Sequence, residues 1–141
     1  MSAPAASHEH LPHRGAMRLI DRVLAGDDTH IRCAARIRAD NPLLVDGRLP
    51  AHAGVELLAQ AGGLLLGARA AGGTAPTAGA IVQIKSFRVH GPDLPVGAVV
   101  EVEARFEGGT GQAALFGGEV RLDGNTILEG SLMIAQLGDT P

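Results

Sequence analysis

Two side chains that can exchange protons lie four residues apart near the middle of the chain, His52 and Glu56. If both residues are helical, this spacing places them on one face of the helix. A histidine and a carboxylate placed in this way are suited to general acid–base catalysis. A structural interpretation is also open, in which His52 is a polar loop residue and Glu56 is a first-turn carboxylate that caps the helix.

Two further positions accompany this pair. Gly54 could expose its backbone amide at the start of the helix, where it would stabilise a developing oxyanion. Gln60, one turn after Glu56, could orient the carboxylate or bind a water molecule. Structurally, Gly54 could be a small residue that the loop requires, and Gln60 a buried amide satisfied by the backbone. Burial would favour a protonated Glu56, whereas the helix N-terminus favours the anion, and the sequence does not decide between these effects.

The element that carries these residues is an apolar helix, expected over residues 52–71. Its only charged residues are Glu56 and Arg69, and a helix that is apolar on every side is buried. Each of its interior glycines lowers helix stability by roughly 1 kcal/mol relative to alanine. Small residues also allow a helix to lie close to a sheet, so packing is expected to compensate.

Alternating apolar and polar residues predict strands on both sides of this helix. Asp123-Gly124 predicts a two-residue hairpin turn, and the first two strands are expected to form another hairpin. The expected strands are residues 17–25, 30–38, 80–89, 98–107, 112–122 and 126–136. Two strands, a helix and four strands in this order predict an α+β fold, in which a curled antiparallel sheet wraps around one central helix.

The composition limits the possible functions. With 141 residues and a formal charge of −3, we expect one domain over residues 11–137, after a disordered tail over residues 1–10. The absence of a basic field and the presence of only three aromatic residues argue against a nucleic-acid partner. No run of 18 apolar residues could span a membrane, and no ligand cluster indicates a metal. The single cysteine, Cys33, and the lack of a signal sequence favour a cytoplasmic protein.

Four motifs occur in order along the chain: LPHR and MRLIDRVL within residues 11–24, ELLAQAG at residues 56–62, IKSFR and PVG within residues 84–97, and a closing hairpin at residues 119–134. Together they resemble the 3-hydroxyacyl-[acyl-carrier-protein] dehydratases. The resemblance implies the hotdog fold, an acyl thioester substrate, no cofactor, and subunits that pair through their strands with the active site between them.

One departure from that family concerns its catalytic histidine, which lies 14 residues before the helix glutamate. At that position this chain has Pro42. The shorter stretch GRLPAHAGVE, residues 47–56, looks more like an atypical subgroup of predicted dehydratases of aryl-polyene pathways. His52 is the nearest candidate for the missing base.

The resemblance implies a dehydration in which a base removes the C2 proton, an acid protonates the C3 hydroxyl, and amide donors stabilise the thioester oxygen. Glu56 would be the acid. The implied partners are an acyl carrier protein and a second hotdog subunit, in a homodimer or a heterodimer. Basic residues that could meet an acidic carrier are Arg14, Arg18, Arg48, Lys85 and Arg88. Two alternatives stay open: a hotdog acyl-thioesterase, and a non-catalytic hotdog subunit of a heteromeric dehydratase.

Overall fold

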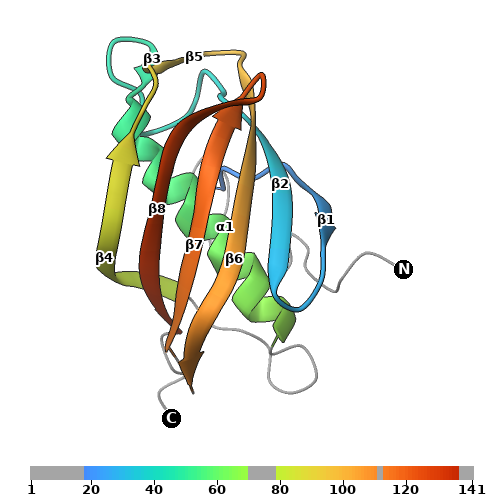
Figure 1. The fold of residues 1–141 in the computed structure, drawn as a ribbon. Coiled ribbons are helices and arrows are strands. Elements are labelled where there is room, and N and C mark those ends of the chain that lie inside the picture. Colours follow the sequence, from blue (N-terminus) through green and yellow to red (C-terminus); the bar gives the residue numbers. More distant parts are fainter. Residues whose placement is uncertain (1–17, 70–78, 111–112, 137–141) are drawn as a thin grey trace.

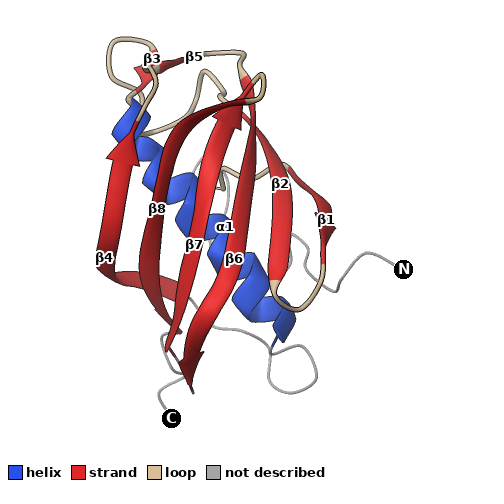
Figure 2. Cartoon of the chain, in the orientation of Figure 1, coloured by secondary structure: helices blue, strands red, loops and turns tan. Residues whose placement is uncertain are grey.

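The computed structural model describes residues 18–69, 79–110 and 113–136. Within these ranges one helix lies against a six-stranded antiparallel sheet that curls around it (Figure 1). Figure 2 shows the helix crossing behind the strands, near the middle of the sheet. The strands follow the order β1-β2-β6-β7-β8-β4, so β1 and β4 are the edges. The predicted α+β architecture is confirmed.

The elements have the following bounds: β1 Arg22–Gly26, β2 His30–Arg36, β3 Arg48–Leu49, η3 Ala51–Ala53, α1 Gly54–Arg69, β4 Gly79–Val89, β5 Leu94–Pro95, β6 Val99–Thr110, β7 Ala113–Leu122 and β8 Asn125–Gln136. The short strands β3 and β5 pair with each other in a separate two-stranded sheet. They lie outside the strands that the sequence predicts. The disorder predicted for residues 1–10 falls outside the described residues.

The alternation predicted for the second strand is present in β2. Ile31, Cys33 and Ala35 are fully buried, and β2 pairs with β6 so that Cys33 lies opposite the buried Val102. Because successive side chains of a strand point to opposite faces, the buried set forms the inner face of the sheet. At the end of β7, Asp123 and Gly124 both have positive φ, 51° and 82°, as a type I′ hairpin turn requires.

The outer face of the sheet carries a ladder of charged side chains across β2, β6 and β7. Arg121 Nη2 lies 2.9 Å from Glu103 Oε1 and 3.4 Å from Glu101 Oε1. Glu103 also pairs with His30, and Arg32 Nε lies 2.8 Å from Glu101 Oε2. Burial raises the pKa of the Glu103 carboxyl, but hydrogen bonds and charges from His30 and Arg121 outweigh burial and lower that pKa below its ordinary value.

The helix approaches the sheet closely because small residues meet large ones at their contact. A Cβ atom on Gly54 would lie 2.8 Å from Leu128 Cδ2, and one on Gly62 would lie 2.8 Å from Ile134 Cδ1. Between them, Leu58 packs over Gly118 of β7. These helix positions are four residues apart and share one face, so the sheet-facing side of α1 is set by its glycines.

Two predicted elements begin later along the chain than the sequence predicts. The helix begins at Gly54 rather than at residue 52, because residues 51–53 form a turn of 3-10 helix. The first strand begins at Arg22 rather than at residue 17; Leu19 and Ile20, just before it, are buried in the core. Among the described residues, no helix is both long enough and apolar enough to cross a membrane.

Candidate functional site

The start of α1 is held in place by the turn that precedes it. The Ala53 amide donates a hydrogen bond to the Pro50 carbonyl over 2.9 Å, and the Ala51 amide donates to Oδ1 of Asp93 over 3.0 Å. Asp93 lies 42 residues further along, just before β5. This long-range contact anchors the segment that carries His52 to the rest of the fold.

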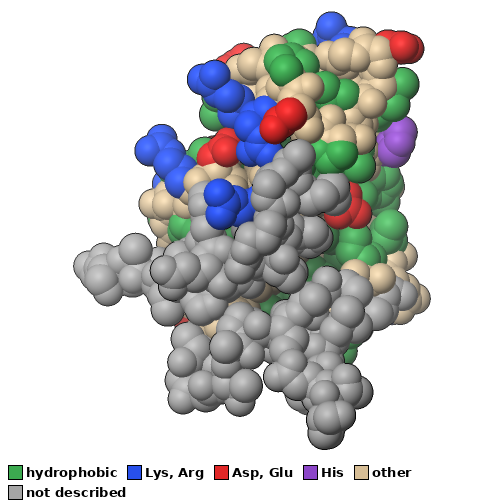
Figure 3. All heavy atoms as spheres, turned by 180° about the vertical axis from the view of Figure 1, so that it is seen from behind, with side chains coloured by type: hydrophobic (Ala, Val, Ile, Leu, Met, Phe, Trp, Pro, Cys, Tyr) green, Lys and Arg blue, Asp and Glu red, His purple; other side chains and the backbone are tan. Residues whose placement is uncertain are grey.

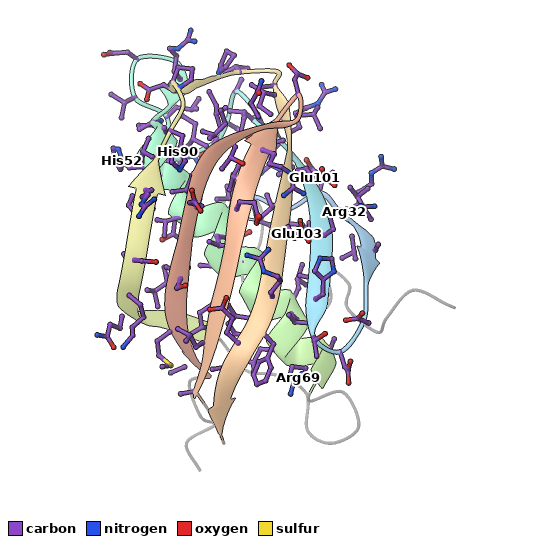
Figure 4. The ribbon with its side chains drawn as sticks, in the orientation of Figure 1. Arg32, His52, Arg69, His90, Glu101 and Glu103 are labelled. Atoms are coloured by element: carbon purple, nitrogen blue, oxygen red, sulfur yellow. The ribbon has the colours of Figure 1, made fainter. Side chains whose placement is uncertain are left out.

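His52 lies in this 3-10 turn, with an exposed side chain. Figure 4 shows it at the corner of the molecule where the helix starts, pointing away from the body of the chain. Because His52 is in the turn and Glu56 is in α1, the two do not lie in one continuous α-helix. Their spacing of four residues therefore does not place the two side chains on one face of a regular α-helix.

Glu56 is the third residue of α1, and its side chain is half-buried. Half-buried residues follow it at helical spacing, namely Ala59, Gly63 and Leu66. This strip faces away from the glycines that contact the sheet. Within the described ranges, the side chains of His52 and Glu56 form no hydrogen bond or ion pair with another residue.

Gly54 sits where α1 begins. Its backbone amide donates to the carbonyls of Ala51 and His52, so this donor is engaged within the turn. Gly54 is buried, and a Cβ atom there would meet Leu128 of β8. The structure therefore gives Gly54 a packing role against β8.

Gln60 is 2% exposed and lies on the core side of α1. Its Oε1 accepts a 2.8 Å hydrogen bond from the backbone amide of Leu19. The side chain therefore ties the segment before β1 to the helix, one turn after Glu56. This contact agrees with the interpretation of Gln60 as a buried amide satisfied by the backbone.

One pair of titratable groups was not singled out from the sequence. His90, directly after β4, places Nε2 2.5 Å from Oε2 of Glu129 on β8. Both side chains are about half exposed, at 40% and 49%. The sequence separation of 39 residues hides this contact; only the β4–β8 pairing, with Arg88 opposite Glu129, brings the two together.

A hollow of about 280 Å³ opens on the outer face of the sheet. Its floor is formed by Gly117, Gly118 and Gly130, and its charged lining by Arg88, Arg105, Glu107 and Glu129. None of the four residues predicted for the site contributes to it. In the part of the chain that the structure describes, no three His, Cys, Asp or Glu side chains form a group that could hold a metal ion.

Among the described residues, the edge strand β4 pairs with β8 on one side only. Ile84 and Val89 on this strand are 49% and 45% exposed. An unpaired edge presents backbone donors and acceptors to another strand. A long edge with exposed apolar side chains is a suitable surface for pairing with a second subunit.

The chain is similar to a known protein family and to solved structures. The family model described as ApeP-like, ApeP dehydratase, matches residues 5–140. The dehydratase heterocomplex ApeI:P from Xenorhabdus doucetiae contains a chain of similar fold, with a TM-score of 0.86 and 24% identity over 99% of this chain and 94% of that one. No curated protein matches the sequence.

More distant structures share the architecture. Protein PH1136 from Pyrococcus horikoshii has a TM-score of 0.69 at 12% identity, with 98% of this chain and 97% of that chain covered. The PaaI protein from the phenylacetic acid degradation operon of E. coli has a TM-score of 0.63 at 13% identity, with 86% and 81% covered. At such identities the likeness concerns the fold alone.

Proposed function

Because the chain belongs to the ApeP-like dehydratase family, we propose that it acts on 3-hydroxyacyl thioesters carried by an acyl carrier protein and converts them to trans-2-enoyl thioesters. The observation that carries this proposal is the half-buried Glu56 in the first turn of α1, with no partner among the described side chains. When protonated, a carboxyl group so placed can give its proton to a bound substrate rather than to another side chain.

In the proposed reaction Glu56 protonates the C3 hydroxyl, so that the C3–O bond breaks and water leaves. A base takes the proton from C2, and the electron pair of that C–H bond forms the C2=C3 double bond. We assign the base to His52, whose exposed imidazole lies in the turn directly before α1. The half-buried strip that runs from Glu56 along Ala59 to Leu66 would contact the acyl chain.

Gly54 and Gln60 enter the proposal as residues that shape the substrate site. Gly54 lets the helix start lie against β8, and Gln60 holds the Leu19 segment against the helix. Negative charge on the thioester oxygen would be stabilised by the N-terminal end of α1, where backbone amides and the helix dipole favour an anion.

We further propose that the site is completed by a second hotdog subunit bound along β4. The support is the unpaired edge of β4 with its exposed Ile84 and Val89. A heterodimer is favoured by one comparison, since the similar chain from Xenorhabdus doucetiae is part of a dehydratase heterocomplex. The reaction would take place in the cytoplasm, which suits the single buried thiol of Cys33.

The test of this function is incubation with a 3-hydroxyacyl thioester of a carrier protein, with and without the partner hotdog subunit. A dehydratase gives an enoyl thioester and water, whereas a thioesterase releases the free thiol of the carrier. Detection of the thiol without the enoyl product would replace the proposal by the thioesterase alternative.

The variant His52→Gln tests whether the base is His52 of this chain or a residue of the partner subunit. If His52 is the base, the variant loses dehydration by about 10²-fold or more even when the partner is present. If it keeps full activity with the partner, the partner supplies the base, and this chain contributes the carboxylate to a shared site.

A further inference from the structure

A cluster of arginines lies at the β1 edge of the sheet. We name Arg18, Arg22 and Arg36 the arginine corner. Arg22 lies opposite Ala34 of β2, two residues before Arg36. Figure 3, seen from the helix side, shows Lys and Arg side chains toward the β1 edge at its left, with Asp and Glu side chains among them. This part of the surface concentrates positive charge in a chain whose formal charge is −3.

The nearby carboxylates pair with Arg38 rather than with the side chains of the arginine corner. Asp21 Oδ2 accepts a hydrogen bond from the Arg36 amide over 2.5 Å, and its Oδ1 lies 3.4 Å from Arg38 Nη1. Asp40 Oδ1 lies 3.1 Å from Arg38 Nε. Among the described residues, the side chains of the arginine corner form no ion pair.

Apolar side chains lie beside these charges. Val99 of β6 pairs directly with Arg36 and is 51% exposed. Leu24 of β1 is 39% exposed. Basic residues around exposed apolar side chains fit a protein partner that presents carboxylates together with apolar residues, because such a partner satisfies both kinds of surface.

The arginine corner is also linked to the candidate site. Arg38 Nη2 donates a 2.9 Å hydrogen bond to the carbonyl of Arg18. The next residue, Leu19, donates its amide to Gln60, one turn after Glu56. One peptide segment therefore joins the charged surface to the helix that carries the proposed acid.

We propose that the arginine corner is the docking surface for the acidic face of the acyl carrier protein. This inference rests on the proposed function, since it names the surface that receives the carrier of the same substrate. The segment 37–53 connects the end of β2 to the start of α1. The Gly54 end of α1 lies over β7 and β8, two to three strand spacings of about 4.8 Å from β2. An extended prosthetic arm of the carrier can cover such a distance.

The other described basic residues that could meet a carrier lie elsewhere. Arg48 is on β3, and Lys85 and Arg88 are on β4, at the opposite edge of the main sheet from β1. Arg14 falls outside the described residues. The three basic surfaces can therefore be tested separately.

The experiment measures binding directly, so that its result does not depend on catalysis. The full chain is titrated with an acidic holo-acyl carrier protein by fluorescence anisotropy. The double variant R22E/R36E is expected to weaken binding by about tenfold or more, because reversing a charge at an interface replaces attraction by repulsion. The charge-conserving variant R22K/R36K should bind within about threefold of the wild type. Binding by the wild type should also weaken as salt is raised.

A matched single reversal provides the control. R36E is compared with R48E, which reverses one exposed arginine outside the arginine corner; circular dichroism verifies that both variants are folded. Equal binding by R22E/R36E and wild type would overturn the inference, as would a larger effect of R48E than of R36E. Binding of the wild type to vesicles of phosphatidylcholine and phosphatidylserine, without binding to the carrier, would also overturn it. Failure of the proposed function is a separate result, in which the carrier binds but its 3-hydroxyacyl thioester is not dehydrated.

Discussion

The backbone amide of Leu19 donates a 2.8 Å hydrogen bond to Oε1 of Gln60, in the second turn of α1. Leu19 is 2% exposed and Gln60 is also 2% exposed. Gln60, a polar residue in an apolar helix, thus has a structural role. It supplies a hydrogen-bond acceptor to a chain segment that is not part of the sheet. This relationship fixes the segment before β1 against the helix.

The substitution Gln60→Met removes this acceptor and keeps a side chain of similar length. The Leu19 amide is then buried without a partner, which costs about 1–3 kcal/mol. We expect the free energy of unfolding, measured in urea, to fall by this amount. As a control, Glu56→Gln should leave it nearly unchanged, since Glu56 is half-buried and has no partner among the described side chains. A Gln60→Met variant as stable as the wild type would show that the hydrogen bond does not stabilise the fold.

Two neighbouring glycines of α1 should respond differently to alanine. A Cβ atom on Gly63 meets nothing within 4 Å, whereas one on Gly62 lies 2.8 Å from Ile134 Cδ1. Because alanine favours the helix by roughly 1 kcal/mol over glycine, Gly63→Ala should stabilise the protein. Gly62→Ala gains the same helix preference but forces Ile134 to move, so it should be the less stable of the two. Thermal unfolding of both variants checks the order, and the reverse order would contradict the described packing of α1 on β8.

Acid should destabilise the fold in part through Glu103. The pKa of this carboxyl is lowered in the folded protein because hydrogen bonds and charges from His30 and Arg121 outweigh burial. A lowered folded pKa means that this stabilisation is present above the ordinary value of 4.5 and is lost as the pH falls below it. The melting temperature, measured between pH 3 and pH 7, should fall less steeply with acid in Glu103→Gln than in the wild type. Glu107→Gln is the control, because this carboxylate is exposed and its hydrogen bond with Ser131 is 3.4 Å long. The same acid dependence in Glu103→Gln and wild type would show that Glu103 does not contribute to destabilisation by acid.

Cys33 should be chemically inert in the folded protein. It is fully buried in β2, and burial raises the pKa of its thiol to about 12. Since the thiolate is the reactive form, a thiol reagent at pH 8 should label Cys33 only after unfolding. Rapid labelling of the native protein would mean that β2 opens more readily than its central packing implies.

The sequence was sufficient to predict those features of the architecture that local patterns determine. The alternation of Ile31, Cys33 and Ala35 identified the buried face of β2, and Asp123-Gly124 identified the hairpin between β7 and β8. Local patterns did not predict the boundaries of the helix and strands, because these boundaries depend on distant contacts. The turn before α1 is held by Asp93, 42 residues away from Ala51, and no local pattern contains that information.

The candidate site was predictable as a set of residues but not as a geometry. Glu56 was identified from its place in an apolar helix and from a motif. The engaged amide of Gly54 and the placement of His52 outside α1 follow from the 3-10 turn, which residue spacing cannot distinguish from the first turn of a helix. The contact of His90 with Glu129 depends on the register of β4 against β8, and that register is set by the whole sheet.

The most direct test of the central claim is the rate at which Glu56→Gln dehydrates a carrier-bound 3-hydroxyacyl thioester, alone and with the partner hotdog subunit. We predict that the rate falls by about 10²–10⁴-fold, the usual contribution of a general acid, while unfolding and carrier binding stay at wild-type values. Turnover by Glu56→Gln at the wild-type rate would contradict the assignment of Glu56 as the acid.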